Sequence, residues 1–267
     1  MRLRSKRNNR AFTLIELLVV IAIIAVLIAI LLPQLGKVRR KANTTKCMAS
    51  VRGMGMSLQY YVTDYKRMMS FTGNPPDSWT QVLKQYGQID KLRLCPEAAT
   101  ANNDNLAQQP WWGSTHSAWG NSSETNTTAG PALVSSFGLN GWLYNVNPAS
   151  AIGTIGGGAP NSYTVPLQTA ESQVPAFADC VWRHVLPKPG DAPVSTGGGA
   201  LGTLEDPSPN DLVNHPISKL IMNRHDKAIN VSFLDGHAST TKLPDLYGLA
   251  WYRNWKPPTT IPPIPKQ

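Results

Sequence analysis

Apolar residues are distributed very unevenly along this chain. Residues 12–32 are almost wholly aliphatic and contain one charged residue, Glu16. At 1.5 Å per residue, a helix over this run would extend about 31 Å, which is close to the thickness of the hydrocarbon core of a bilayer. The run is longer than the apolar region of a secretory signal, and Leu31-Leu32-Pro33-Gln34 lacks the small-residue cleavage site of such a signal. We therefore expect residues 12–35 to form a transmembrane helix that remains as an anchor.

An amphipathic helical pattern follows over residues 36–66. Its apolar residues have the i, i+3, i+4 spacing of one helix face; they are Val51, Met54, Leu58, Tyr61, Val62 and Tyr65. This pattern predicts that the helix continues and docks its apolar face on a globular head. Pro33 removes a backbone donor and clashes one turn back, so we expect it to kink or loosen the helix.

Residues 67–254 predict a β-rich head with long loops. A turn at residues 73–76 precedes a short second helix from Trp79 to Tyr86. The strand-like runs are Lys91 to Cys95, Val134 to Tyr144, Val174 to Arg183 and Ala228 to Leu234. The last run ends in Asp235-Gly236, which favours a type I′ hairpin with residues 237–241 as the return strand. We therefore expect an α+β fold, in which a small antiparallel sheet packs on a long N-terminal helix. Residues 255–267 form a Pro-rich, extended tail.

The formal net charge of +9 is concentrated beside the apolar run. Five basic residues precede the run and five more lie at residues 37–46, which leaves 15 of the 25 basic and 15 of the 16 acidic residues for the rest of the chain. Lys and Arg next to an apolar helix suit anionic lipid headgroups. Nucleic-acid binding needs a basic face on the folded part, so the charge pattern argues against a nucleic-acid partner.

The segment Arg10-Ala11-Phe12-Thr13-Leu14-Ile15-Glu16-Leu17-Leu18-Val19-Val20 resembles the N-terminal motif of type IV prepilins and type II secretion pseudopilins. The resemblance implies that prepilin peptidase cuts between Ala11 and Phe12 and that the new Phe12 amine is N-methylated. It also implies that Glu16 pairs with the Phe12 amine of a neighbouring subunit, which supplies the partner that a carboxylate in an apolar helix requires. The family usually has glycine before the cut, where this chain has Ala11.

For the whole chain, the resemblance implies a filament subunit with the lollipop architecture of pilins. Residues 1–11 would be a cytoplasmic leader, residues 12–35 a single-pass inner-membrane anchor, and the head would be periplasmic. In this family a proline at the position of Pro33 is associated with a helix that bends when it packs into a filament. The implied partners are further subunits, prepilin peptidase, the inner-membrane assembly platform and membrane lipid.

His225 is followed by nine residues and then by Asp235-Gly236, which resembles the H-X9-DG signature of a prepilin-type family of planctomycetes, verrucomicrobia and related bacteria. Other segments similar to that family are Cys47, Trp79, Cys95-Pro96, residues 136–142 and Arg224. The family is structural and secretory, so the resemblance implies no catalysis and no cofactor.

A metal site and an enzyme are two alternative hypotheses. His225, Asp235 and His237 invite a metal hypothesis, with Asp179 as a fourth ligand, because imidazole and carboxylate groups suit zinc. We favour the simpler interpretation, in which Asp235 shapes the turn and His225 hydrogen-bonds a loop, and we predict no metal. A Ser-His-Asp hydrolase lacks the G-x-S-x-G motif, and we predict no enzyme.

The tryptophans and cysteines leave two further expectations. All eight tryptophans lie C-terminal to the long helix, and exposed tryptophans would suit carbohydrate stacking, so a membrane-anchored adhesion protein is the alternative function. An envelope location permits disulfides. Cys47 lies on the long helix and Cys95 follows a helix expected to run back beside it, so we expect a Cys47–Cys95 disulfide with Cys180 free.

Overall fold

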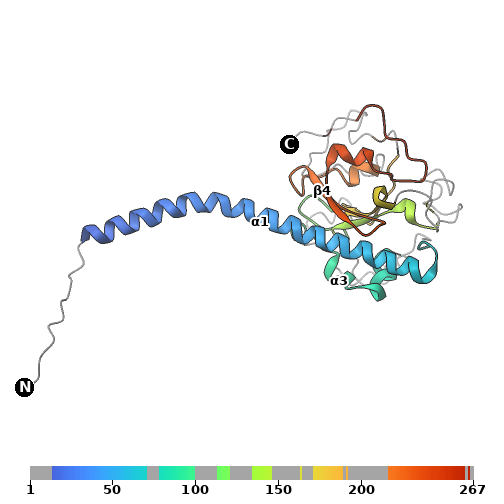
Figure 1. The fold of residues 1–267 in the computed structure, drawn as a ribbon, viewed down its shortest axis with the longest axis horizontal. Coiled ribbons are helices and arrows are strands. Elements are labelled where there is room, and N and C mark those ends of the chain that lie inside the picture. The colour runs from blue at the N-terminus through green and yellow to red at the C-terminus, as the bar shows by residue number, and fades with distance from the viewer. Residues whose placement is uncertain are drawn as a thin grey trace, which may run out of the picture. The chain divides into compact units, whose positions relative to one another are not determined.

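The computed structural model describes residues 14–70, 78–99, 113–120, 134–145, 163, 171–188, 191, 216–261 and 264. The chain divides into two compact units, Met1–Ala42 and Asn43–Gln267. The helix α1 (Leu14–Tyr65), drawn in blue in Figure 1, contributes residues to both units and is assigned as helix throughout, Pro33 included. The predicted leader, residues 1–11, and the predicted turn at residues 73–76 lie outside the described residues.

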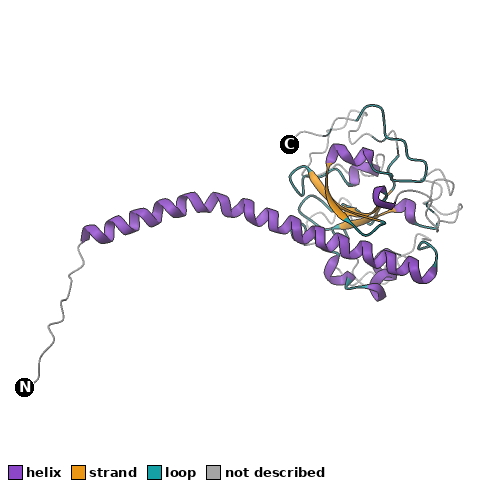
Figure 2. Cartoon of the chain, in the orientation of Figure 1, coloured by secondary structure: helices purple, strands orange, loops and turns teal. Residues whose placement is uncertain are grey.

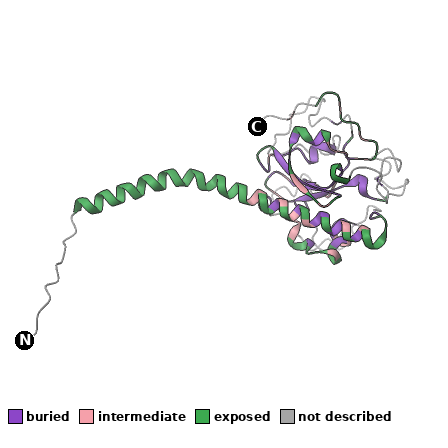
Figure 3. Cartoon of the chain, in the orientation of Figure 1, coloured by how far each residue is buried: buried purple, intermediate pink, exposed green. Residues whose placement is uncertain are grey.

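In the first unit, α1 presents aliphatic side chains that are not buried by the chain. Every residue from Leu14 to Ala42 is exposed, as the green colour of this stretch in Figure 3 shows. Between Leu14 and Leu35 the sequence has no glycine, and a helix satisfies all its backbone hydrogen bonds internally, as a lipid environment requires. Among the described residues, α1 is the one helix long and apolar enough to cross a membrane by length and composition.

The second unit is built on a five-stranded sheet with the strand order β3-β1-β2-β4-β5, drawn in orange in Figure 2. The strands are β1 (Phe137–Asn140), β2 (Pro175–Asp179), β3 (His184–Val185), β4 (Ala228–Phe233) and β5 (Ala238–Lys242). The pairs β1–β2, β2–β4 and β4–β5 are antiparallel, whereas β1–β3 is parallel. The α+β expectation is confirmed, but the sheet is mixed rather than antiparallel, because the chain reverses after β2 and returns on the far side of β1.

Short helices surround the sheet. They are α2 (Trp79–Val82), η2 (Leu83–Tyr86), α3 (Ile89–Leu92), η3 (Gly141–Leu143), η5 (Glu171–Gln173), η6 (Pro216–Lys219) and η7 (Leu243–Gly248). The predicted helix from Trp79 to Tyr86 is confirmed as α2 followed directly by η2. The predicted strand from Lys91 to Cys95 is wrong, because local hydrogen bonds from Leu92 N–H to Gln88 (3.0 Å) and from Arg93 N–H to Ile89 (2.9 Å) close a helical turn there instead.

The hairpin between β4 and β5 is confirmed, but its turn differs from the predicted type I′. A type I′ turn needs positive φ at both central residues; here Gly236 has φ 88° and Asp235 does not have positive φ. The Gly236 N–H donates to the Phe233 carbonyl (3.0 Å), and the Phe233 N–H donates to the His237 carbonyl (2.9 Å). This is the three-residue loop that ends in a left-handed glycine. The Asp235 carboxylate accepts from the His237 N–H at 3.0 Å and so braces the turn.

One part of the core lies between the sheet and the part of α1 that belongs to the second unit. Val51, Met54, Leu58 and Tyr61 of the predicted apolar stripe are buried, whereas Val62 is half-buried and Tyr65 exposed. The helix runs close to β4, since a Cβ added at Gly55 would lie 3.0 Å from the Ser232 hydroxyl oxygen. Gln59 fixes the same contact by donating from Nε2 to the Leu234 carbonyl at 2.6 Å.

We predict that Leu58→Ala lowers the free energy of unfolding of the full-length chain by about 2–5 kcal/mol, because it leaves a cavity at a fully buried position. The matched control is Met56→Ala on the same helix, where the side chain is 38% exposed and the expected loss is within about 1 kcal/mol. Denaturant unfolding in detergent micelles, followed by near-UV circular dichroism, measures both. Equal losses in the two variants would contradict the docking of α1 on the sheet.

Candidate functional site

The N-terminal segment carries the first group of predicted functional residues. Ala11 and Phe12, the predicted cleavage site, lie outside the described residues. Glu16 lies in the first turn of α1, where a carboxylate interacts favourably with the positive end of the helix dipole. Its neighbours Leu14 and Ile15 are 79% and 74% exposed. The segment therefore combines a carboxylate with a long aliphatic surface that is open to lipid or to protein.

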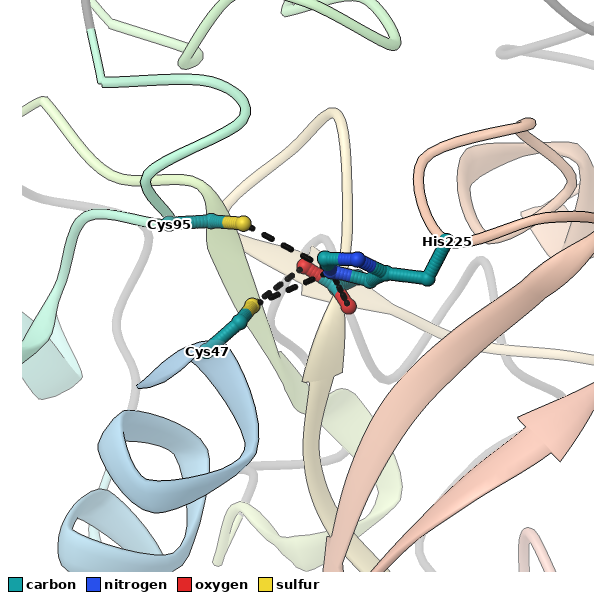
Figure 4. A group of neighbouring side chains, drawn as sticks. Cys47, Cys95 and His225 are labelled. Carbon is teal, nitrogen blue, oxygen red and sulfur yellow. Dashed lines mark hydrogen bonds and ion pairs between the residues drawn. The ribbon is translucent and has the colours of Figure 1, made fainter. Parts of the chain in front are cut away.

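A second group of side chains converges inside the second unit. Cys47 comes from α1, Cys95 from the loop after α3, Asp179 from the last position of β2 and His225 from the loop before β4, and all four are buried. Figure 4 shows Cys47, Cys95 and His225 pointing toward one another from separate elements. Their potential metal-ligating atoms and that of Asp179 all lie within 4.8 Å of one another, so this group could hold a metal ion.

The imidazole of His225 is central to this cluster. Its Nε2 lies 3.2 Å from Cys47 Sγ, 3.5 Å from Cys95 Sγ and 3.3 Å from Asp179 Oδ2. Cys47 Sγ in turn lies 3.4 Å from Asp179 Oδ1. The other ring nitrogen, Nδ1, is 3.1 Å from the Thr44 hydroxyl. The imidazole is therefore held from both sides.

Asp179 is fixed by two further partners. Its Oδ1 accepts from Arg224 Nη1 at 3.1 Å, and its Oδ2 accepts from the Asn230 N–H at 2.8 Å. The guanidinium of Arg224 also donates to the carbonyls of Thr115 (3.0 Å), Ser136 (2.6 Å) and Ser114 (2.7 Å). The ion pair has no solvent-exposed side-chain surface, so these hydrogen bonds are what compensate the desolvation of its charges.

The cluster shifts the pKa values of its own members. Burial opposes ionisation of Asp179, but hydrogen bonding to His225 and the charge of Arg224 hold its pKa below the usual value. Burial alone would lower the pKa of His225, but its hydrogen bond to Asp179 raises it to about 9. The hydrogen bond from Cys47 lowers the pKa of the Cys95 thiol to about 6, whereas burial raises that of Cys47. Cys95 is thus the thiol that ionises first.

The structure brings together two pairs of residues that the sequence analysis considered separately. It brings Cys47 next to Cys95, as the disulfide hypothesis requires, but both are free thiols, and so is Cys180. It brings His225 next to Asp179, but the other proposed ligands lie beyond the far end of β4. There His237 Nδ1 and Asp235 Oδ1 form a partly exposed pair at 2.6 Å. His225 therefore does not share a site with Asp235 and His237.

Sequence reasoning missed the four-residue cluster and the role of Arg224. A usable signal existed, because Cys47, Cys95, Arg224 and His225 all belong to the segments that resemble the H-X9-DG family. Their sequence separations, such as 178 residues between Cys47 and His225, kept that signal from indicating a contact.

Comparisons with known proteins match the N-terminal part of the chain. Residues 6–32 match the prokaryotic N-terminal methylation motif. The chain is also 44% identical over 68 residues to the type IV wide pilus major component PilA4 of Thermus thermophilus, a match that covers 26% of this chain and 50% of the relative. The chain thus spans half the length of that relative. No solved structure matches the chain.

We predict that Arg224→Met lowers the free energy of unfolding by about 3–5 kcal/mol, because it removes the guanidinium that pairs with the buried Asp179 carboxylate. The matched control is Lys84→Met, which removes a 3.8 Å ion pair to Asp90 whose side chains are 40% and 58% exposed; we expect it to cost less than about 1 kcal/mol. Denaturant unfolding of the full-length variants measures the difference. A loss for Arg224→Met no larger than that of the control would contradict the structural importance of this ion pair.

Proposed function

Since the chain is a type IV prepilin-like protein, we propose that it is a subunit of a type IV pilus or of a type II secretion pseudopilus-like filament. The observation that carries the proposal is the exposed aliphatic surface of α1, which begins at Leu14, inside the matched methylation motif (residues 6–32), and extends to Val38. A surface of this size is stable only when lipid or protein covers it. A bilayer covers it before assembly, and the helices of neighbouring subunits cover it afterwards.

Processing and topology are part of the same proposal. Prepilin peptidase removes residues 1–11 by cutting between Ala11 and Phe12, and the new Phe12 amine is methylated. The N-terminus is cytoplasmic, the helix spans the inner membrane once, and the second unit is periplasmic until the assembly platform moves the subunit into a filament. The basic residues at 37–46 compete with this orientation under the positive-inside rule, so recognition of the leader by the peptidase and its machinery decides the outcome.

Glu16 supplies the specific contact between subunits. Placing the Glu16 carboxylate in an apolar environment costs free energy, and pairing with the positive Phe12 amine of a neighbour offsets that cost. The pairing fixes the axial register of one helix against the next. Pro33 removes one backbone hydrogen bond from α1, so we propose that the helix unwinds there at low cost when it packs into the filament.

Tryptophan exposure does not favour the alternative, a carbohydrate-binding adhesion protein. Trp79, Trp119, Trp142 and Trp251 are buried, and Trp182 and Trp255 are half-buried. The four buried indoles each donate to a backbone carbonyl, which is typical of core residues. Among the tryptophans that the structure describes, none offers a fully exposed ring for sugar stacking; Trp111 and Trp112 lie outside the described residues.

We predict that Glu16→Gln and Glu16→Val leave the second unit folded but reduce sheared surface filaments at least about tenfold, because the Phe12 amine of each neighbour loses its anionic partner. Glu16→Gln tests charge separately from size. The readouts are filament yield by electron microscopy and immunoblotting, and head folding by resistance to limited proteolysis.

Glu171→Gln is the matched control, because it removes an exposed carboxylate from the second unit and should leave filament yield unchanged. Normal filament yield from both Glu16 variants would rule out the pairing with Phe12.

A further inference from the structure

We propose that Cys47, Cys95, Asp179 and His225 are the four ligands of a structural Zn²⁺ ion that joins α1 to the sheet. The proposal concerns the second unit alone and does not depend on filament assembly. Its basis is the geometry of the cluster, the hydrogen bonds behind His225 and Asp179, and the charge balance.

Several distances within the cluster are close to those of a tetrahedral zinc site, and all four ligand atoms lie within 4.8 Å of one another. Zinc bonds of about 2.3 Å to sulfur, 2.0–2.1 Å to nitrogen and 2.0–2.2 Å to oxygen place the ligand atoms about 3.4–3.8 Å apart. The observed separations of 3.2, 3.5 and 3.3 Å from His225 Nε2, and of 3.4 Å between Cys47 Sγ and Asp179 Oδ1, are within a few tenths of an ångström of these values. The four side chains therefore point toward a common centre, and small side-chain adjustments would complete a tetrahedral set.

Hydrogen bonds account for part of this arrangement, because the Cys47 thiol can donate to Asp179 Oδ1 at 3.4 Å. An imidazole Nε2 carries at most one proton, so it can satisfy only one of the two sulfurs and the carboxylate oxygen around it. A cation at the centre of the group would satisfy all of them, with the Nε2 lone pair as one of its ligands. Buried polar groups are otherwise expected to have their hydrogen-bonding capacity fulfilled.

The groups behind the ligands are those that support a metal site. A ligating histidine usually donates from its other ring nitrogen to a fixed acceptor, which sets its tautomer; His225 has the Thr44 hydroxyl 3.1 Å from Nδ1. A ligating carboxylate is in turn held by hydrogen bonds, and Asp179 has the Asn230 N–H and Arg224. Arg224 is itself anchored by three backbone carbonyls.

Charge and ligand type favour zinc over other common divalent ions. Two thiolates, one carboxylate and a neutral imidazole carry a charge of −3, so Zn²⁺ leaves −1, which Arg224 neutralises inside the protein. Thiolate ligands select zinc over Mg²⁺ and Ca²⁺, which prefer oxygen. Four buried protein ligands leave no position for a substrate, so the site is structural.

The proposed site has a defined structural role. Cys47 lies in the first turns of α1 that belong to the second unit, whereas Asp179 and His225 flank the adjacent central strands β2 and β4. Coordination would hold the helix on the sheet by metal–ligand bonds in addition to the apolar stripe that begins at Val51.

Metal content of the full-length chain tests the proposal. We expect the protein, purified in detergent under a phosphine reductant and dialysed after loading with ZnCl₂, to retain one zinc per chain by inductively coupled plasma mass spectrometry. Replacing zinc with Co²⁺ should give the visible ligand-field bands of a tetrahedral site and a thiolate-to-cobalt charge-transfer band. Cys95→Ala should lower zinc affinity at least about a hundredfold, and Thr44→Val about 10–100-fold, the usual effect of removing an outer partner.

The matched control is Cys180→Ala, which removes a cysteine that is equally buried but lies outside the ligand set and should keep its zinc. If Cys95→Ala does not fold, the cobalt spectrum of the unmodified chain still tests the proposal. Three results would overturn the proposal: less than about 0.1 zinc per chain with free thiols, a Cys47–Cys95 disulfide in protein isolated from the cell envelope, or equal zinc binding by Cys95→Ala and the unmodified chain.

Discussion

The aliphatic surface that α1 exposes between Leu14 and Val38 is the physical constraint on which the other features of this chain depend. The hydrophobic effect makes permanent exposure of this surface to water unfavourable, so the helix needs lipid or other helices around it. Both environments explain the surrounding sequence. Basic residues on either side suit lipid headgroups, and a single carboxylate, Glu16, suits a specific contact between helices rather than a uniform lipid surface. The remainder of the chain, which is formally neutral from residue 47 onward, is free to be an ordinary folded unit.

That folded unit uses the same helix in a different way. From Cys47 to Tyr61, α1 buries one face against the sheet, and Gly55 and Gln59 bring it close to β4. Beside this apolar contact lies a polar one, centred on Asp179 and its partners Arg224 and His225. Buried polar groups are tolerated only when their charges and hydrogen bonds are satisfied. Arg224 meets this requirement through its backbone contacts, and a zinc ion would meet it for the two thiols and the imidazole.

The sequence predicted those parts of the structure that depend on local patterns. The apolar run, the stripe from Val51 to Tyr61 and the strands β2 and β4 follow from composition and periodicity. The sequence-based predictions missed or misassigned features that depend on competition between local interactions or on long-range contacts. Lys91 and Leu92 belong to the helix α3, because local hydrogen bonds outweighed a weak strand pattern there. The two-residue strand β3 pairs in parallel with β1, and so short a segment carries no periodicity of its own. The cluster joins residues up to 178 positions apart, and no spacing rule connects them without the fold.

The proposed function depends most directly on removal of the leader. The decisive measurement is the intact mass of the protein extracted from membranes of cells with and without prepilin peptidase. We predict a peptidase-dependent loss of residues 1–11, with one added methyl group on Phe12. A full-length chain of the same mass in both strains would contradict the filament-subunit proposal and leave a single-pass membrane protein with an exposed folded unit.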